Sequence, residues 1–386
     1  TYSEYDAAKE LSLEEAEEDV NYLFDAFYYD FAFYDYFGGH TVFDQAKAEI
    51  LQELQAKDNL TCKDLQEVLV KHLTFIKDGH FNINHNFPAE KEIPFFFRQV
   101  MFVKTDSGYQ DSKGKTVVSV DGHPDLDTLF KRSISQEGYL VYYPVLLKEA
   151  KFDGTEWDKH VCDEQLTVHY ADGSTDVLTA DTWSQYYKDL PKGQNTDLRQ
   201  TDGIPVFQFN SFDGSFLQEV NAAAAQMSDA AISMLDLRSN IGGYEEVAHQ
   251  WINRYSRQRV FSTGVRYSVL SASLVASPST SKTPRASNDN ILILLSGKCS
   301  ASSAEITLDL SYNLDNSLII GENTNGSMIS NSGHIELPNS KCSVDMTFST
   351  VYLTPDGSDY FEELRGFFPD IWVPAKEAET LAAKLM

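Results

Sequence analysis

The sequence lacks several features that would assign a protein to a familiar class at once. No apolar run approaches the roughly 20 residues that a helix needs to cross a bilayer, so we expect no transmembrane helix. Basic residues are few, and 31 Lys and Arg against 58 Asp and Glu give a formal net charge of −27. Because nucleic acids and anionic membrane surfaces are themselves negative, this charge disfavours both as partners.

Cysteine is also scarce. The four cysteines are Cys62, Cys162, Cys299 and Cys342, and no two of them form a CxxC pair. The spacing typical of a zinc site is therefore absent, and we expect neither a metal nor another cofactor. Four cysteines allow three disulfide pairings, among them Cys299 with Cys342, and the sequence leaves these open beside the alternative of buried free thiols.

The composition that is present is that of a globular protein. The chain has 386 residues, of which 42% are hydrophobic and 23% charged, and this length predicts a large core and two or three domains. The sequence begins with Thr1 rather than methionine. From this we expect that a leader segment has been removed.

Residues 1–92 are predicted to form a helical region that ends in a strand. Ser12–Glu15 has the spacing of a capping box, and apolar residues then recur at helical intervals. We expect the last helix to stop at Asp78–His80. From residue 81 to residue 87 apolar and polar side chains alternate, which predicts a strand with His80 at its start, on the polar face.

Residues 93–200 are predicted to form a separate β-rich module of about a hundred residues. Val117–Val120 and Leu166–Tyr170 have the composition of strands, and each leads into an Asp-Gly turn. Residues 126–135 between them are predicted as a short helix. The polar segment Lys192–Asp197 is expected to be the linker that follows the module.

Residues 201–386 alternate between predicted strands and helices, which is typical of an α/β layer with mostly parallel strands. In such sheets ligands bind beyond the carboxyl ends of the strands. The predicted elements are strands at 206–209, 231–237, 291–295 and 318–320, and helices at 216–227, 245–255 and directly after Ser302.

Ser302 lies where the strand at 291–295 turns into a helix. A serine there meets the free N–H groups and the positive end of the helix dipole, which stabilise an oxyanion. This is a common place for a serine nucleophile. The alternative is an ordinary N-cap serine.

A second turn of the same kind follows the strand at 231–237. Gly242 and Gly243 there allow the backbone to approach a ligand closely, and this turn should face the same site as Ser302. Asp236 and Arg238, just before it, are expected to form a structural ion pair.

Five motifs in this order resemble the tail-specific and C-terminal processing proteases, the S41 serine peptidases. The resemblance covers Ile204–Val373 well and the helical start loosely. It is weakest in the β-rich module, which stands where the family has a PDZ-like domain. The motifs are Asp78-Gly79-His80, DLRSNIGG at 236–243, ASSAE at 301–305, GENTNG at 321–326 and ELRGFFPDI at 363–371.

This resemblance implies an α/β fold with a crotonase/ClpP-like catalytic core, a helical N-terminal region and a PDZ-like module. In one branch of the family a lysine activates the serine, but Ser327 stands at the aligned position. The tricorn-like branch uses a histidine and a glutamate, which His80 and Glu363 match. In that branch a serine precedes the histidine, whereas here the neighbour is Gly79.

The resemblance also implies a role for each site residue. Ser302 is the nucleophile, because the family serine lies three residues before a glutamate, and Ser303 is the rival candidate. A serine hydroxyl needs a base, and the unperturbed pKa of histidine, about 6.5, suits it to that task. His80 is therefore the base and Glu363 orients it. The backbone N–H groups of Ser303 and of Gly242 or Gly243 form the oxyanion hole.

Other assignments of the base and of the acid stay open. His85 and His334 are weaker candidates for the base, and Glu362 is an alternative to Glu363.

The sequence thus predicts a secreted or envelope-associated serine endopeptidase that acts on peptides or proteins. Two alternatives remain, an inactive peptide-binding scaffold of the same fold and an esterase with the same triad. Cleavage preference and oligomeric state do not follow from the sequence.

Overall fold

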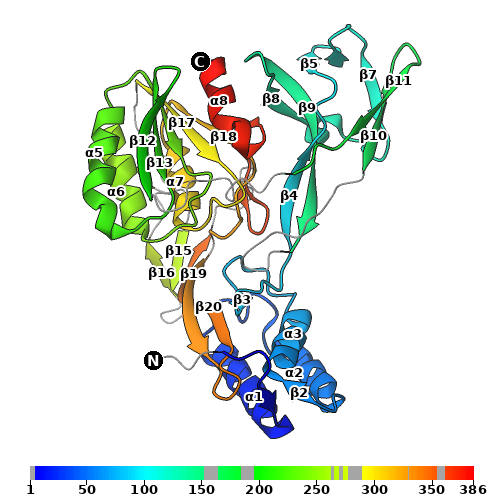
Figure 1. Ribbon diagram of the computed structural model, residues 1–386, viewed down its shortest axis with the longest axis vertical. Coiled ribbons are helices and arrows are strands. Elements are labelled where there is room, and N and C mark those ends of the chain that lie inside the picture. The colour runs from blue at the N-terminus through cyan, green and yellow to red at the C-terminus, as the bar shows by residue number, and fades with distance from the viewer. Residues whose placement is uncertain are drawn as a thin grey trace.

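The structure is a computed structural model, and it describes residues 5–151, 164–183, 195–261, 265–268, 273–276, 289–328, 330–353 and 361–386. The N-terminal helices gather at one end of the molecule, and the α/β core and a β-rich part lie side by side at the other (Figure 1). None of the helices in these ranges combines the length and the apolarity needed to cross a membrane.

The N-terminal end is helical, as predicted. Helices α1 (Leu13–Asp30), α2 (Gly39–Gln55) and α3 (Cys62–His72) pack together beside the short strands β1 (Glu10–Leu11) and β2 (Leu60–Thr61). The predicted capping box is present, since Ser12 Oγ accepts from Glu15 N while Glu15 caps the backbone N–H of Ser12. The phenylalanines Phe27 and Phe43 are almost fully buried in the core of this region, whereas Tyr29 and Tyr36 are exposed.

Two details of the predicted N-terminal region are wrong. Helix α3 ends at His72 and not at Asp78–His80. The following strand, β3, is only Asn82–Ile83, because Asn84 and His85 both adopt positive φ and turn the chain back. Asn82 is buried and donates to Asp345 Oδ2, so the alternation predicted for residues 81–87 does not separate an apolar face from a solvent face.

The β-rich part consists of two sheets that share one apolar cluster. In the first sheet the strand order is β4-β9-β5-β6 with β8 beside β9, and in the second it is β11-β10-β7. The strands are β4 (Lys91–Phe96), β5 (Phe102–Thr105), β6 (Gly108–Asp111), β7 (Val117–Val120), β8 (Phe130–Ile134), β9 (Leu140–Ala150), β10 (Gln165–Tyr170) and β11 (Thr175–Thr179).

The predicted helix over residues 126–135 is wrong. Helix α4 covers only Leu126–Leu129, and residues 130–134 form β8. Phe130 and Ile134 are buried when that segment pairs with β9, so tertiary packing decides its structure. The predicted strands at 117–120 and 166–170 are present.

The α/β core contains a sheet with the strand order β12-β13-β14-β17-β18-β23. All neighbours from β13 onward are parallel, as the alternation predicted, and β12 is antiparallel to β13. The strands are β12 (Thr196–Thr201), β13 (Ile204–Phe209), β14 (Ile232–Asp236), β17 (Ile291–Ser296), β18 (Ser317–Gly321) and β23 (Ile371–Trp372). Of the predicted linker, residues 192–194 lie outside the described ranges, and Thr196 and Asp197 begin β12.

Helices cover both faces of this sheet. One face packs against α5 (Leu217–Met227), α6 (Glu245–Ser256) and α7 (Ser303–Ser311). The other face packs against the C-terminal helix α8 (Ala375–Leu385), which stands at the top of Figure 1.

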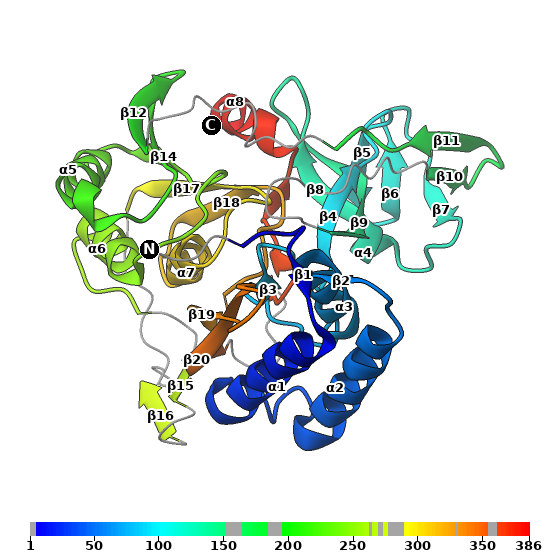
Figure 2. The same ribbon diagram turned by 60° about the horizontal axis from the view of Figure 1, so that its bottom comes forward.

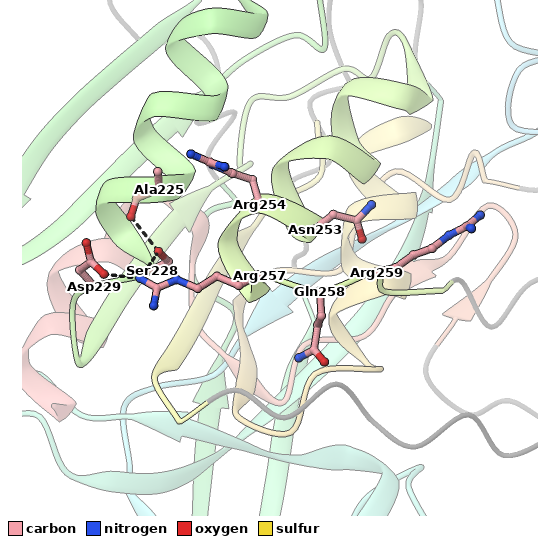
Figure 3. Close-up of a pocket in the computed structure, with 8 residues that line it drawn as sticks. All are labelled: Ala225, Ser228, Asp229, Asn253, Arg254, Arg257, Gln258 and Arg259. Carbon is pink, nitrogen blue, oxygen red and sulfur yellow. Dashed lines mark hydrogen bonds and ion pairs between the residues drawn. The ribbon is translucent and has the colours of Figure 1, made fainter.

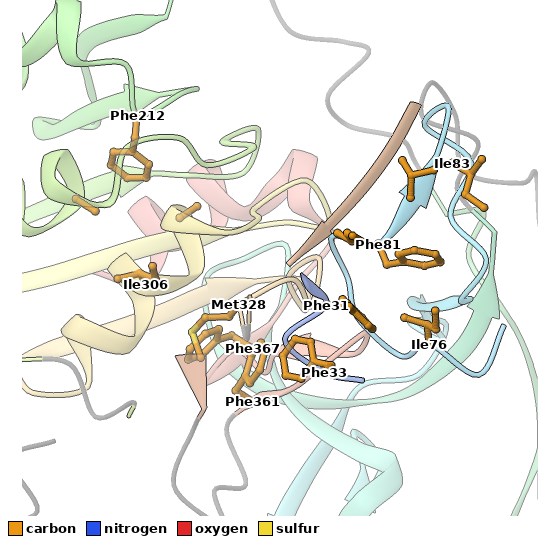
Figure 4. Packing of buried hydrophobic residues seen from close by; sticks show 14 of the residues in the cluster. Phe31, Phe33, Ile76, Phe81, Ile83, Phe212, Ile306, Met328, Phe361 and Phe367 are labelled. Carbon is orange, nitrogen blue, oxygen red and sulfur yellow. The ribbon is translucent and has the colours of Figure 1, made fainter. Parts of the chain in front are cut away.

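A further sheet joins the core to the helical end (Figure 2). Its long strand β20 (Ser343–Leu353) pairs with β19 (Ser330–Glu336), with β15 (Val265–Ser268) and with β3, while β16 (Ser273–Ala276) pairs with β15. A short hairpin of β21 (Phe361–Glu362) and β22 (Gly366–Phe367) lies near α7. One continuous apolar cluster runs from the helices into the core (Figure 4).

Candidate active site

Ser302 holds an unusual backbone conformation directly before α7. Its φ of 55° and ψ of −118° lie in a region that residues other than glycine rarely adopt. Such strain persists only where the surroundings impose it, and it gathers at functional sites. The side chain is half-buried, and the backbone N–H donates to Glu305 Oε2 at 3.0 Å.

The loop after β14 lies against Ser302, as its place after a parallel strand predicted. A Cβ added to Gly242 would stand 2.7 Å from Ser302 Cβ, and its φ is +97°, so only glycine fits there. The backbone N–H of Gly242 donates to Asn240 Oδ1 at 2.8 Å. Ser303 Oγ donates to the carbonyl of Gly243 at 2.6 Å and joins the two turns.

Glu305 is a fully buried carboxylate that organises the site. Besides the Ser302 N–H, it accepts from Thr324 Oγ1 and from the backbone N–H groups of Gly326 and Ser327, at distances between 2.5 and 2.8 Å. Burial raises the pKa of Glu305, against the effect of these hydrogen bonds. Glu305 thereby joins the turn of Ser302 to the segment Asn325–Ser327, called the β18 loop below.

His80 belongs to a turn that packs on the β18 loop through Gly79. The backbone of Gly79, next to it, packs on Gly326 so closely that an added Cβ would stand 2.3 Å from the Gly326 carbonyl. Ser327 Oγ lies 3.0 Å from the Gly79 carbonyl. Burial lowers the pKa of the half-buried His80, against the effect of Asp78, which favours a neutral imidazole.

Glu363 reaches the same turn from the segment after β21. Its Oε1 accepts from the Gly79 N–H at 2.8 Å and its Oε2 from the Met328 N–H at 3.2 Å. Burial, followed by the charges of Asp78 and Glu305, raises the pKa of Glu363 well above its ordinary value.

The alternative candidates lie in other surroundings. Glu362 is exposed and pairs with Arg365. His334 pairs with Asp345 at 3.0 Å with its side chain 48% exposed, and His85 is part of the turn after β3.

Sequence reasoning missed two lysines at this site. Lys91 is 2% and Lys298 3% exposed, and burial lowers their pKa values to about 8 and about 7. Lys298 Nζ donates to the Thr324 carbonyl at 2.6 Å. A signal for Lys91 was available, because it shares the period-two face of β4 with the buried Ile93 and Phe95.

Two further expectations have clear outcomes. The ion pair of Asp236 and Arg238 is present, with a 2.7 Å contact. Cys62, Cys299 and Cys342 are free thiols, so a Cys299–Cys342 bridge is excluded, and Cys162 lies outside the described ranges.

A large surface pocket of about 670 Å³ lies elsewhere (Figure 3). Its lining comes from the ends of α5 and α6 and includes Arg254, Arg257 and Arg259. Arg257 pairs with Asp229, which precedes β14. The pocket is therefore at the amino end of β14, whereas Ser302 lies beyond the carboxyl ends of the strands.

Comparisons with known proteins agree with this geometry. Residues 203–373 match the sequence profile described as Peptidase family S41. No curated protein matches the chain. The structure resembles that of mature CPAF, with 12% identity, a TM-score of 0.51 and coverage of 97% of each chain.

Two more solved structures are similar. Mature CPAF complexed with lactacystin shares 13% identity, with a TM-score of 0.51 and 96% of each chain covered. The photosystem II D1 C-terminal processing protease shares 14% identity, with a TM-score of 0.42 and 94% of each chain covered. The CPAF likeness extends over the whole fold, whereas the profile match contains Ser302 and Glu363 but begins at residue 203, after His80. The profile match supports peptidase family S41, and with it a peptidase, for the α/β core, and the likeness to CPAF supports the fold.

Proposed function

We propose that this chain is a serine endopeptidase in which Ser302 is the nucleophile, His80 the general base and Glu363 the residue that orients His80. This assigns it to the histidine-based, tricorn-like branch of the S41 peptidases. The observation that carries the proposal is the strained backbone of Ser302 at the start of α7, against Gly242. A nucleophile on such a turn projects its hydroxyl toward the ligand.

His80 would act in the neutral form that its burial favours. It takes the proton of the Ser302 hydroxyl as the oxygen attacks the scissile carbonyl, and it returns the proton to the leaving amine. Water then hydrolyses the acyl-enzyme by the same route. Glu363 supports His80 through the hydrogen bond from the Gly79 N–H.

The developing oxyanion would be held by the backbone N–H groups of Ser303 and Gly243. Ser303 directly follows the nucleophile at the first turn of α7, where N–H groups point away from the helix. Gly242 is not assigned to the oxyanion hole, because its own N–H already donates to Asn240. Its role is to leave room for the Ser302 side chain.

The finer features of the molecule belong to the same proposal. Residues 1–92 form the helical region, 93–200 a PDZ-like module and 201–386 a crotonase/ClpP-like catalytic core. The substrates are peptides or proteins, with C-terminal processing as the activity and nucleic acid excluded as a partner. The protein acts outside the cytoplasm, in secreted or envelope-associated form.

The test is covalent labelling by a fluorophosphonate together with hydrolysis of a fluorescently labelled, unstructured protein. The wild type should react at Ser302 with loss of fluoride. Ser302→Ala should lose labelling and at least about 10³-fold of its hydrolysis, with unchanged thermal unfolding. Ser311→Ala, at the far end of α7, is the matched control and should behave as the wild type.

Each other outcome contradicts a part of the proposal. Hydrolysis retained by Ser302→Ala would remove the assigned nucleophile. An unlabelled and inactive wild type would favour the inactive scaffold. Ester turnover exceeding peptide turnover by several orders of magnitude would favour an esterase.

A further inference from the structure

Lys91, at the start of β4 in the β-rich part, places a buried ammonium group in the proposed site. Its Nζ donates to Ser327 Oγ at 2.8 Å, to the Gly79 carbonyl at 3.1 Å and to Asn325 Oδ1. Two of these acceptors belong to the β18 loop, and the third is next to His80. The ammonium group thus joins three separate segments of the chain at one point.

The hydrogen bonding defines what this lysine does. An ammonium group has three N–H donors and no acceptor, and here each donor has an acceptor. Lys91 therefore offers no lone pair to take a proton from Ser302 in this arrangement. It is suited to hold other groups in place.

The charges around Lys91 come from several elements. Asp78 lies on the turn before His80, Glu305 on α7 and Glu363 after β21, and all three carboxylates act on Lys91 across the buried site. His80, Lys298 and Cys299 also face it. The positive charge of Lys91 favours ionised Glu305 and Glu363 and disfavours a second positive charge on His80.

We propose that Lys91 is a positioning residue of the peptidase site, which fixes the turn of His80 on the β18 loop and places a positive charge near His80 and Glu363. This inference rests on the proposed Ser302–His80 function. Ser327, one of its acceptors, stands where the resemblance aligns the lysine of the other S41 branch. A lysine from a different strand thus brings an ammonium group to that position, with a different role.

The test follows the rate of fluorophosphonate labelling of Ser302 from pH 5 to pH 9, which needs no knowledge of the natural substrate. Lys91→Met removes the charge and the three hydrogen bonds. We expect its plateau rate to fall about 10- to 100-fold. The pH at which the labelling rate falls to half of its plateau on the acidic side, the acidic midpoint, should rise by about one unit. The reason is that loss of a nearby positive charge raises the pKa values of both His80 and Glu363.

Two variants separate this role from mere packing. Lys91→Arg keeps the charge and should keep the acidic midpoint of the wild type while restoring part of the plateau. Lys131→Met is the matched control, since Lys131 is a half-buried lysine of β8 outside the site, and it should match the wild type. An unmoved midpoint in a folded Lys91→Met would overturn the proposal, as would an Arg variant that behaves like the Met variant.

If Lys91→Met does not fold, Ser327→Ala takes its place. It removes one acceptor and leaves the charge, so we expect a plateau about tenfold lower and the wild-type midpoint. An unchanged plateau would contradict the positioning role. Failure of the proposed function is distinguishable, because the wild type itself would then remain unlabelled.

Discussion

At the scale of single residues, Gly79 explains a departure from the tricorn-like pattern. That pattern has a serine before the histidine, which relays the glutamate. Here the backbone of the β18 loop fills the space, since a Cβ on Gly79 would lie 2.3 Å from the Gly326 carbonyl and 2.8 Å from Ser327 Cα. Glu363 instead accepts directly from the Gly79 N–H. The carboxylate is therefore joined to the turn of His80 without a serine at position 79.

Introducing a serine at position 79 should therefore destabilise the protein. Gly79→Ser forces the β18 loop away from the turn of His80, and overpacking of this kind costs about 1–3 kcal/mol of unfolding free energy. We expect lower stability in urea unfolding and slower labelling of Ser302. Gly214→Ser is the matched control, because a Cβ there meets nothing within 4 Å and its φ is not positive. A Gly79→Ser variant that is as stable as the wild type and is labelled faster at Ser302 would contradict this. It would show that a serine relay to the glutamate, and not the available space, determines which residue is best at position 79.

The sequence predicted some of these residues and missed others for a physical reason. Ser302 and Gly242 follow neighbouring parallel strands, so their proximity could be derived from local patterns. Lys91 and Ser327 are 236 positions apart. Their contact depends on how distant segments pack, which no local pattern contains.

At the scale of elements, helix α8 is held on the core by a cluster of charges. Glu379 accepts from Arg199 of β12 and from Arg238, with a 2.8 Å contact to the latter. Arg199 and Arg238 also pair with Asp236 at the end of β14. The cluster links α8 to two strands that the sequence alone could not connect with it.

This cluster predicts how stability depends on pH. Burial acts to raise the pKa of Glu379, but hydrogen bonds from Arg199 and Thr201 outweigh it and lower the pKa below its usual 4.5. A lowered folded-state pKa gives stability that is present above pH 4.5 and lost as the pH falls through the folded value. Glu379→Gln should therefore unfold with about 1–3 kcal/mol less free energy at pH 7.

The difference from the wild type should then shrink below about pH 4, as the wild type loses its own carboxylate charge. Urea unfolding at pH 7, 5 and 3 measures it. Glu219→Gln, on the exposed side of α5, is the control and should leave stability unchanged. A deficit of the same size at all three pH values would mean that shape, and not charge, holds α8.

Element boundaries were predicted well where one pattern dominated. The helices and parallel strands between residues 204 and 320 match because apolar runs or periodic apolar residues mark them in the sequence. Residues 126–135 were misjudged because Phe130 and Ile134 fit a helix or a strand equally, and pairing with β9 decided between them. The prediction for the segment after His80 was wrong for another reason. Its polar Asn82 is buried, because its side chain donates a hydrogen bond to Asp345.

At the scale of the whole molecule, the proposed site draws residues from all three parts of the chain. The core provides Ser302 and Glu305, the helical region provides His80, and the β-rich part provides Lys91. The pairing of β3 with β20 fixes the first junction. Arg98 bonds with Glu377 of α8 across the second. A separated core would therefore lack both the proposed base and the lysine that positions it.

The net charge of −27 should act on substrates before they bind. A negative surface raises the local concentration of cationic peptides, and this effect falls with ionic strength as the Debye length shrinks to about 10 Å at 0.1 M salt. We expect kcat/KM for a lysine-rich peptide to exceed that for a glutamate-rich peptide of equal length by at least about tenfold at low salt. As the salt concentration rises, the ratio of the two kcat/KM values should fall toward the value set by contacts within the site alone. The kcat/KM of a neutral peptide should not change with salt. A ratio that does not change with salt would mean that contacts within the site, and not the field of the molecule, select the substrate.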